Sequence, residues 1–111
     1  MTASRLAQLL EFYKEDPTDP FTIYAIATEY LKIDIEKSRY YYELLLADHV
    51  DYVGTYYHAG KLYEQFGEKD KAEAVYKKGM QVSREMGQMH AFSELQQAYN
   101  KFMGLDYEDE D

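Results

Sequence analysis

The pattern between Tyr52 and Arg84 limits the possible folds more than any other feature of this chain. Tyr56, Ala59, Gly60 and Tyr63 are separated by offsets of three and four residues. Such offsets return to one face of an α-helix. A glycine inside a helix costs about 1 kcal/mol relative to alanine. The usual compensation is the close approach of a second helix, so we expect one to pack against Gly60.

The segment that follows supplies matching small residues. Ala72 and Gly79 are small, and Tyr76 lies between them. Gly67 suits a left-handed residue after the end of a helix, and Asp70 suits an N-cap. The stretch therefore predicts two antiparallel helices in which small residues face large ones. Two amphipathic helices of an unrelated bundle are the alternative.

A second copy of this pattern occurs earlier in the chain. Four positions recur at a separation of thirty-four residues: Ser38, Tyr42, Leu45 and Leu46 precede Ala72, Tyr76, Gly79 and Met80. Ile23, Ala27 and Tyr30 repeat the spacing of the helical stripe, with Ala27 in place of Gly60. The alignment needs one gap, and Ile23 replaces a bulky aromatic residue. The register match nevertheless predicts a duplicated helical hairpin.

These residues resemble the tetratricopeptide repeat, whose signature is W-x-x-L-G-x-x-Y followed by A-x-x-x-F in a unit of about 34 residues. The chain is similar to a small bacterial-type member of that family. The resemblance implies an all-α fold, an α-α superhelix of about six antiparallel helices. It also implies two full repeats with capping helices.

The segments on either side of the two repeats are expected to form the remaining helices. The apolar residues before Lys14 predict a first helix that Thr2 or Ser4 caps, and Asp19 with Pro20 starts the next one. Gly87 is expected to end the second repeat, and Gln96 suits the polar outer face of a terminal helix. We therefore expect one domain over residues 1–104, comprising a half repeat (1–17), repeat 1 (19–51), repeat 2 (52–86) and a capping helix (88–104). A disordered acidic tail (105–111) is expected to follow.

Charge and composition exclude several classes of function. The net charge is −9, and five acids lie in the last six residues. Nucleic-acid binding needs a concentrated basic face, so we expect none. The tail is interpreted as a solvated end, with an acidic peptide for a basic partner as the alternative. The chain contains no cysteine and no long apolar run. Its first residues are not typical of a signal peptide, so we expect a soluble cytoplasmic protein without membrane association.

No motif of a catalytic, cofactor or metal site is present. The three histidines, His49, His58 and His90, form no helical metal pair. His49 with Asp51 is more consistent with a surface loop than with a weak metal site. Acidic residues such as Glu64 and Glu68 are typical of a solvated face. We therefore expect no enzyme activity, no cofactor and no metal.

Tyrosine is the unusual component, with thirteen in 111 residues. Their spacing places six in the core: Tyr30, Tyr42, Tyr56, Tyr63, Tyr76 and Tyr99. Tyr24 and Tyr57 each follow a stripe residue by one position and turn away from the packing face. Either they contact a partner, as tyrosine suits a peptide-binding surface, or they pack on each other and shield the core.

In tetratricopeptide repeats the first helix of each pair lines a concave face, and the resemblance places a groove there. Its expected residues are Phe21, Tyr24, Thr28, Leu31 and Lys32, then Tyr57, His58, Lys61, Glu64 and Gln65, then His90, Ser93, Gln97, Asn100 and Lys101. Chaperone-binding members carry a lysine and asparagine clamp for a carboxylate pair. Tyr24, Thr28 and His58 stand at the corresponding places, so the clamp is not expected.

The predicted function is a non-catalytic protein–protein interaction module, an adaptor or scaffold that binds a peptide or helix of an unidentified partner in a short tyrosine-rich groove. The alternative is a self-associating structural protein, a homodimer formed through Leu31, Leu44 or the Tyr40–Tyr41 surface. An enzyme is the third possibility.

Overall fold

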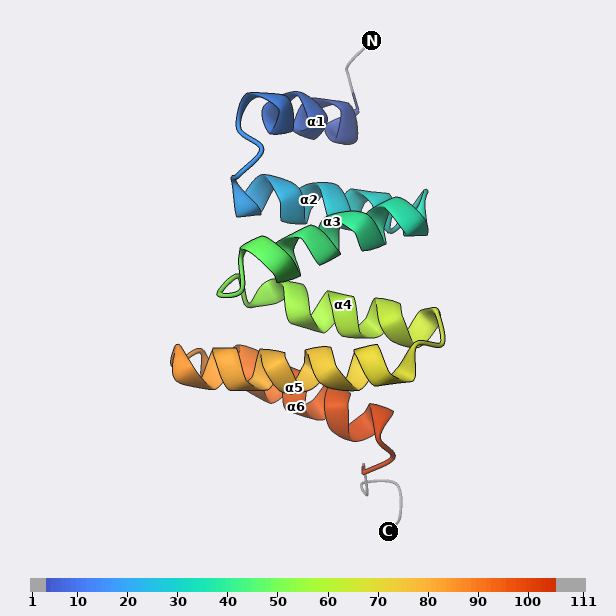
Figure 1. The fold of residues 1–111 in the computed structure, drawn as a ribbon, viewed down its shortest axis with the longest axis vertical. Helices are drawn as coiled ribbons and strands as arrows, with labels where there is room; N and C mark the ends of the chain where they lie inside the picture. The colour runs from blue at the N-terminus through green and yellow to red at the C-terminus, as the bar shows by residue number, and fades with distance from the viewer. Residues whose placement is uncertain (1–3, 106–111) are drawn as a thin grey trace. The chain divides into compact units, whose positions relative to one another are not determined.

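The computed structural model describes residues 4–105. These residues form six α-helices and no β-strand (Figure 1). The helices are α1 (Arg5–Glu15), α2 (Pro20–Tyr30), α3 (Ile35–Asp48), α4 (Gly54–Gln65), α5 (Lys69–Glu85) and α6 (Met89–Phe102). The chain divides into two compact units, Met1–Thr55 and Tyr56–Asp111. All but the first residue of the expected acidic tail lies outside the described residues, as does Thr2.

The helix ends follow from local side-chain chemistry. Ser4 caps α1, because its hydroxyl accepts a hydrogen bond from the Ala7 N–H at 3.0 Å. Asp19 caps α2 and accepts hydrogen bonds from the Phe21 N–H at 3.3 Å and the Thr22 hydroxyl at 2.7 Å. Gly67 has a φ of 75°, a conformation that favours glycine just after a helix. These predicted starts and stops are confirmed.

The predicted N-cap of α5 is wrong. The helix begins at Lys69, and Glu68 occupies the cap position without a side-chain hydrogen bond to the backbone. The Glu68 N–H donates to the Tyr63 carbonyl at 2.9 Å, a bond of the Schellman type that ends α4 and leaves Glu68 directly before α5. Asp70 consequently lies in the first turn, where its negative charge complements the helix dipole.

In the first unit, α2 and α3 run antiparallel side by side (Figure 1). Their close approach is visible in a buried hydrogen bond, in which the Ser38 hydroxyl donates to the Ala27 carbonyl at 2.7 Å. Helix α1 covers α2 with Leu9, which packs among Ala25, Ile26 and Tyr30. Ala27 has no exposed surface, as the close-contact prediction requires.

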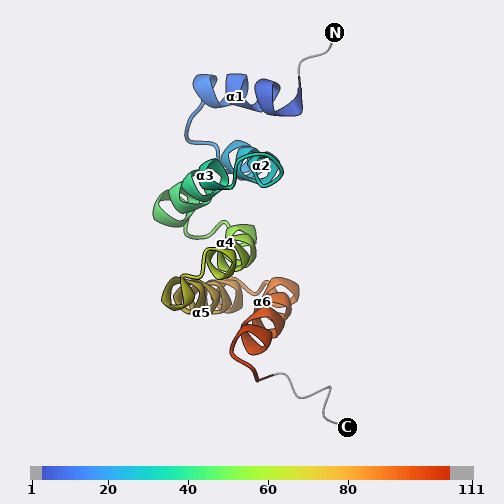
Figure 2. The ribbon, with the colours of Figure 1, turned by 90° about the vertical axis from the view of Figure 1, so that its right-hand side faces the viewer.

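In the second unit, α5 packs against α6 (Figure 2). Small residues of this unit face tyrosines of the neighbouring helix. A Cβ added at Gly60 would overlap the Tyr76 ring. A Cβ added at Gly79 would lie 2.5 Å from the Tyr56 Cβ and 3.0 Å from the Leu95 Cδ1. Each glycine therefore accommodates a tyrosine of the facing helix, and the prediction of small residues against large ones is confirmed.

The tyrosines that the spacing placed in the core are mostly there. Five of the six are at most 8 % exposed: Tyr30, Tyr42, Tyr56, Tyr63 and Tyr76. Tyr99 is half-buried, and Gln96 beside it is exposed on α6. The polar outer face expected of a terminal helix is thus present at Gln96.

Candidate protein-interaction site

The first-unit residues of the expected groove lie on α2 and in the turn that follows it. Leu31 is 36 % exposed, and Phe21 is more exposed still. Tyr24 is half-buried because its ring packs at centroid distances of 6.1 Å from Tyr42 and 5.4 Å from Tyr52. Burial raises the pKa of Tyr24 above its ordinary value. Much of the Tyr24 ring therefore supports the fold of this unit.

Thr28 is bonded within the first unit. Its hydroxyl donates to the Tyr24 carbonyl at 2.9 Å and lies 2.9 Å from the Tyr42 hydroxyl. A threonine hydroxyl carries one proton, so Tyr42 is the donor in the second hydrogen bond. Burial raises the pKa of Tyr42 to about 12. Thr28 thus accepts the hydrogen bond of a buried tyrosine hydroxyl.

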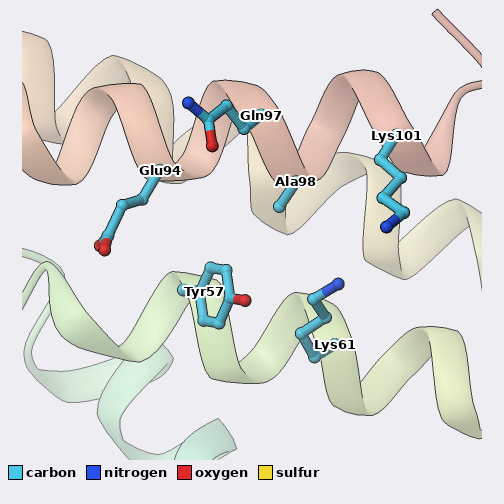
Figure 3. Close-up of a pocket in the computed structure, with 6 residues that line it drawn as sticks. All are labelled: Tyr57, Lys61, Glu94, Gln97, Ala98 and Lys101. Atoms are coloured by element: carbon cyan, nitrogen blue, oxygen red, sulfur yellow. The ribbon is translucent and has the colours of Figure 1, made fainter. Parts of the chain in front are cut away.

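The second unit contains a pocket of about 280 Å³ between α4 and α6. Two residues of α4 and four of α6 line it: Tyr57, Lys61, Glu94, Gln97, Ala98 and Lys101 (Figure 3). Tyr57 is 37 % exposed, which leaves part of its ring available to a ligand. Ordinary small-molecule sites are about 300–1,000 Å³. The volume of this pocket is just below that range.

The charges in the pocket are separated. Glu94 lies at one end, and Lys101 and Lys61 lie toward the other (Figure 3). The Lys61 ammonium is 5.8 Å from the centroid of the Tyr57 ring, within the range of a cation–π contact. The Glu94 carboxylate lies 3.4 Å from His90 Nε2 on the same helix. The pocket is thus acidic at one end and basic at the other.

Two other predicted groove residues of this unit have roles in the fold. The Tyr76 hydroxyl donates to the Glu64 carboxylate at 2.6 Å, so Glu64 is more than part of a solvated face. His58 is half-buried, and its ring packs edge-on against Tyr57 at 5.6 Å. Burial lowers the pKa of His58 below its ordinary value, while Glu94 acts in the opposite direction.

The structure brings Tyr57, Lys61, Gln97 and Lys101 of the expected groove into one pocket. It adds Glu94 and Ala98, which the sequence interpretation did not include. Their spacing contained a signal, because Glu94, Ala98 and Lys101 follow offsets of four and three on α6. The remaining α6 residues of the expected groove are absent from the pocket lining: His90, Ser93 and Asn100.

Within residues 4–105, no group of three or more histidine or acidic side chains is arranged to hold a metal ion. No helix in that range is long and apolar enough to cross a membrane.

Comparison with solved structures decides the family. The solution NMR structure of a tetratricopeptide repeat domain protein from Salinibacter ruber matches with a TM-score of 0.76 and 47 % sequence identity, over 83 % of this chain and 94 % of that chain. A crystal structure of a tetratricopeptide repeat domain protein from Salinibacter ruber gives a TM-score of 0.74 and 47 % identity, over 79 % of this chain and all of the other.

The chain belongs to the tetratricopeptide repeat family. No family model matches it, and no curated protein matches it. The all-α tetratricopeptide repeat fold expected from the sequence is confirmed. Tetratricopeptide repeat domains generally bind protein partners, and proteins of this fold are generally non-catalytic.

Proposed function

We propose that this tetratricopeptide repeat protein is a non-catalytic adaptor that binds a peptide segment of a partner protein. The observation that carries the proposal is the pocket between α4 and α6, which a partly exposed Tyr57 lines together with Lys61 and Lys101. Tyrosine offers a broad contact area at a small cost in rotamer entropy.

The groove of this proposal is centred on the second unit. Thr28 and Glu64 bond to buried tyrosines, and Tyr24 packs on two rings. Tyr57 and Lys61 instead present their side chains to the pocket (Figure 3). We also propose the division into repeats over 19–51 and 52–86, with a half repeat before and a capping helix after. The ends of α1 to α6 are compatible with these boundaries.

The test uses one groove variant and one matched control in the full-length chain. Tyr57→Ala removes the ring from the pocket, whereas Tyr40→Ala removes a 57 % exposed ring on α3. Partners captured from the native cell are identified by mass spectrometry, and their binding is then measured with purified proteins. We expect Tyr57→Ala to weaken binding and Tyr40→Ala to leave it unchanged. Unaltered binding by a folded Tyr57→Ala protein contradicts the proposal.

Self-association is the second candidate, and the exposure of Tyr40 favours it. Tyr40 contacts Tyr41 at a centroid distance of 5.0 Å, and Tyr41 itself stacks on Tyr30 at 5.8 Å. A homodimer through this surface or through Leu31 predicts a mass that rises with concentration and falls on Tyr40→Ala. Sedimentation velocity across a wide concentration range checks it, and a constant monomer mass eliminates the homodimer.

A further inference from the structure

We infer that the pocket between α4 and α6 recognises charge order in its partner. Its ligand is an extended peptide with one basic and one acidic side chain, the basic one at the Glu94 end and the acidic one at the Lys61 and Lys101 end. This inference rests on the proposed function and specifies the chemistry of the partner. It follows from the separation of opposite charges within a single small pocket.

The distance between the two ends sets the spacing of the ligand charges. Glu94 and Lys101 are seven residues apart on α6, and at 1.5 Å per residue their positions on the helix are about 10 Å apart. A polyproline II peptide rises about 3.1 Å per residue and has three residues per turn. Side chains three residues apart on such a peptide share a face at a separation of about 9 Å. A basic and an acidic residue at that spacing match the pocket.

The middle of the pocket suits the backbone between those two charges. Tyr57 offers an aromatic surface, and Ala98 has a small side chain that leaves room between α6 and α4 (Figure 3). The Gln97 amide both donates and accepts hydrogen bonds, as an extended backbone requires. A peptide without internal hydrogen bonds keeps its own N–H and C=O groups available for such contacts.

The acidic end excludes a simpler ligand. A run of acidic residues would meet Lys61 and Lys101 favourably, but it would place a negative charge against Glu94. Like charges brought together in an interface select against a partner. Glu94 therefore makes the pocket specific for a ligand with both charges.

The experiment measures binding of labelled proline-rich peptides to the full-length protein by fluorescence anisotropy. The reference peptide carries Lys and Glu three residues apart, in each of the two sequence orders. Matched peptides replace the Lys, the Glu or both by Gln. Exposed ion pairs are worth about 0.2–1 kcal/mol, so we expect each charge to improve affinity by roughly 1.5- to 5-fold at low salt. One sequence order is expected to bind more tightly than the other.

Two protein variants assign each ligand charge to one end of the pocket. Lys101→Gln is expected to weaken only peptides that carry the Glu, and Glu94→Gln only peptides that carry the Lys. Lys78→Gln, at an exposed position of α5, serves as the matched control. Added salt should reduce these differences, because exposed charges are screened.

Several outcomes overturn the inference while leaving the proposed function intact. These are equal binding of all peptides, preference for the Glu-only peptide, and equal effects of both variants on every peptide. A self-association that Glu94→Gln abolishes also overturns it, because a second copy then occupies the pocket. If no peptide binds, the inference fails as well. The proposed function is contradicted only by the separate result that Tyr57→Ala leaves the binding of native partners unchanged.

Discussion

The hairpin α2–α3 has Ala27 at the place where the hairpin α4–α5 has Gly60. In the first hairpin, Ile23 and Leu45 are both buried at the positions that correspond to Tyr56 and Gly79 in the second. The second hairpin therefore combines a larger residue on its first helix with a smaller one on its second. Because interiors are close-packed, an increase in volume on one helix must be matched by a decrease on the facing helix.

The two hairpins also satisfy their buried tyrosine hydroxyls differently. Tyr42 and Tyr76 occupy corresponding positions and are fully buried. Tyr42 donates to the neutral hydroxyl of Thr28, whereas Tyr76 donates to the Glu64 carboxylate. Thr28 follows Ala27 by one position, while Glu64 follows Gly60 by four. Both hairpins thus have a buried tyrosine at the same position of the second helix. The residue that accepts its hydroxyl hydrogen bond comes from a different position of the first helix.

The largest expected effect tests the contact at Gly60. Gly60→Leu places a branched side chain where the Tyr76 ring already lies, and we expect a loss of about 1–3 kcal/mol or more in unfolding free energy. Gly54→Ala is the matched control on the same helix, because its Cβ would be 3.5 Å from the Tyr24 Cε1, an ordinary contact. Urea denaturation measures both. Equal tolerance of the two substitutions contradicts a close contact at Gly60.

The next prediction concerns a double variant that gives the α4–α5 hairpin the core residues of the α2–α3 hairpin. Gly79→Leu alone should destabilise the protein, since its side chain overlaps Tyr56 and Leu95. Tyr56→Ile with Gly79→Leu recreates the Ile23 and Leu45 combination. We expect a favourable coupling of about 1–3 kcal/mol between the two substitutions, as found for residues in contact. Strictly additive losses in the double-mutant cycle would show that the two hairpins are not packed alike.

The difference between the two hydroxyl acceptors predicts a smaller effect. Tyr76→Phe removes a hydrogen bond to a charged group and should cost about 1.5–3 kcal/mol, whereas Tyr42→Phe removes one between neutral groups and should cost about 0.5–1.5 kcal/mol. Tyr57→Phe, on the partly exposed ring, is the control with no expected change. Chemical denaturation of the three proteins at neutral pH gives the order. A larger loss for Tyr42→Phe would reverse the assignment of the stronger bond.

The smallest expected effect concerns pH and the second unit. Burial lowers the pKa of His58, so the fold favours the neutral imidazole. The resulting stabilisation is fully present above the ordinary pKa of about 6.5 and is lost as pH falls below it. His58→Gln should therefore flatten the decline in unfolding free energy between about pH 6.5 and 5. A decline that His58→Gln leaves unchanged would assign the titration to another group.

Most of the fold was predictable because its signals are local. Ser4, Asp19 and Gly67 act within a few residues of themselves, so their caps and turns follow from the chain without knowledge of the packing. The one wrong cap, Asp70, lies two residues after the observed N-cap, Glu68, which has no side-chain cap hydrogen bond that the sequence pattern could have indicated. The boundaries of the repeats stay a prediction.

The candidate site was less predictable. The spacing of α4 and α6 indicated Tyr57, Lys61 and Gln97, but Glu94 and Ala98 join them only where the two helices face each other. Thr28 and Glu64 were expected in the groove on their spacing alone, and the spacing did not indicate that both accept hydrogen bonds from buried tyrosines. A polar side chain forms an internal hydrogen bond only if the facing helix places a donor or acceptor within reach. The distance between two facing helices cannot be read from residue spacing along one of them.

The amino-acid order alone established six helices, their hairpin pairing and the places where small residues receive large ones. It did so because helical periodicity, helix capping and the free-energy cost of glycine inside a helix are properties of short segments. The position of the pocket and its acidic and basic ends were decided by the tertiary structure. Those features require side chains of α4 and α6 to lie close together, although they are far apart in the sequence. Their proximity depends on how both helices pack on α5.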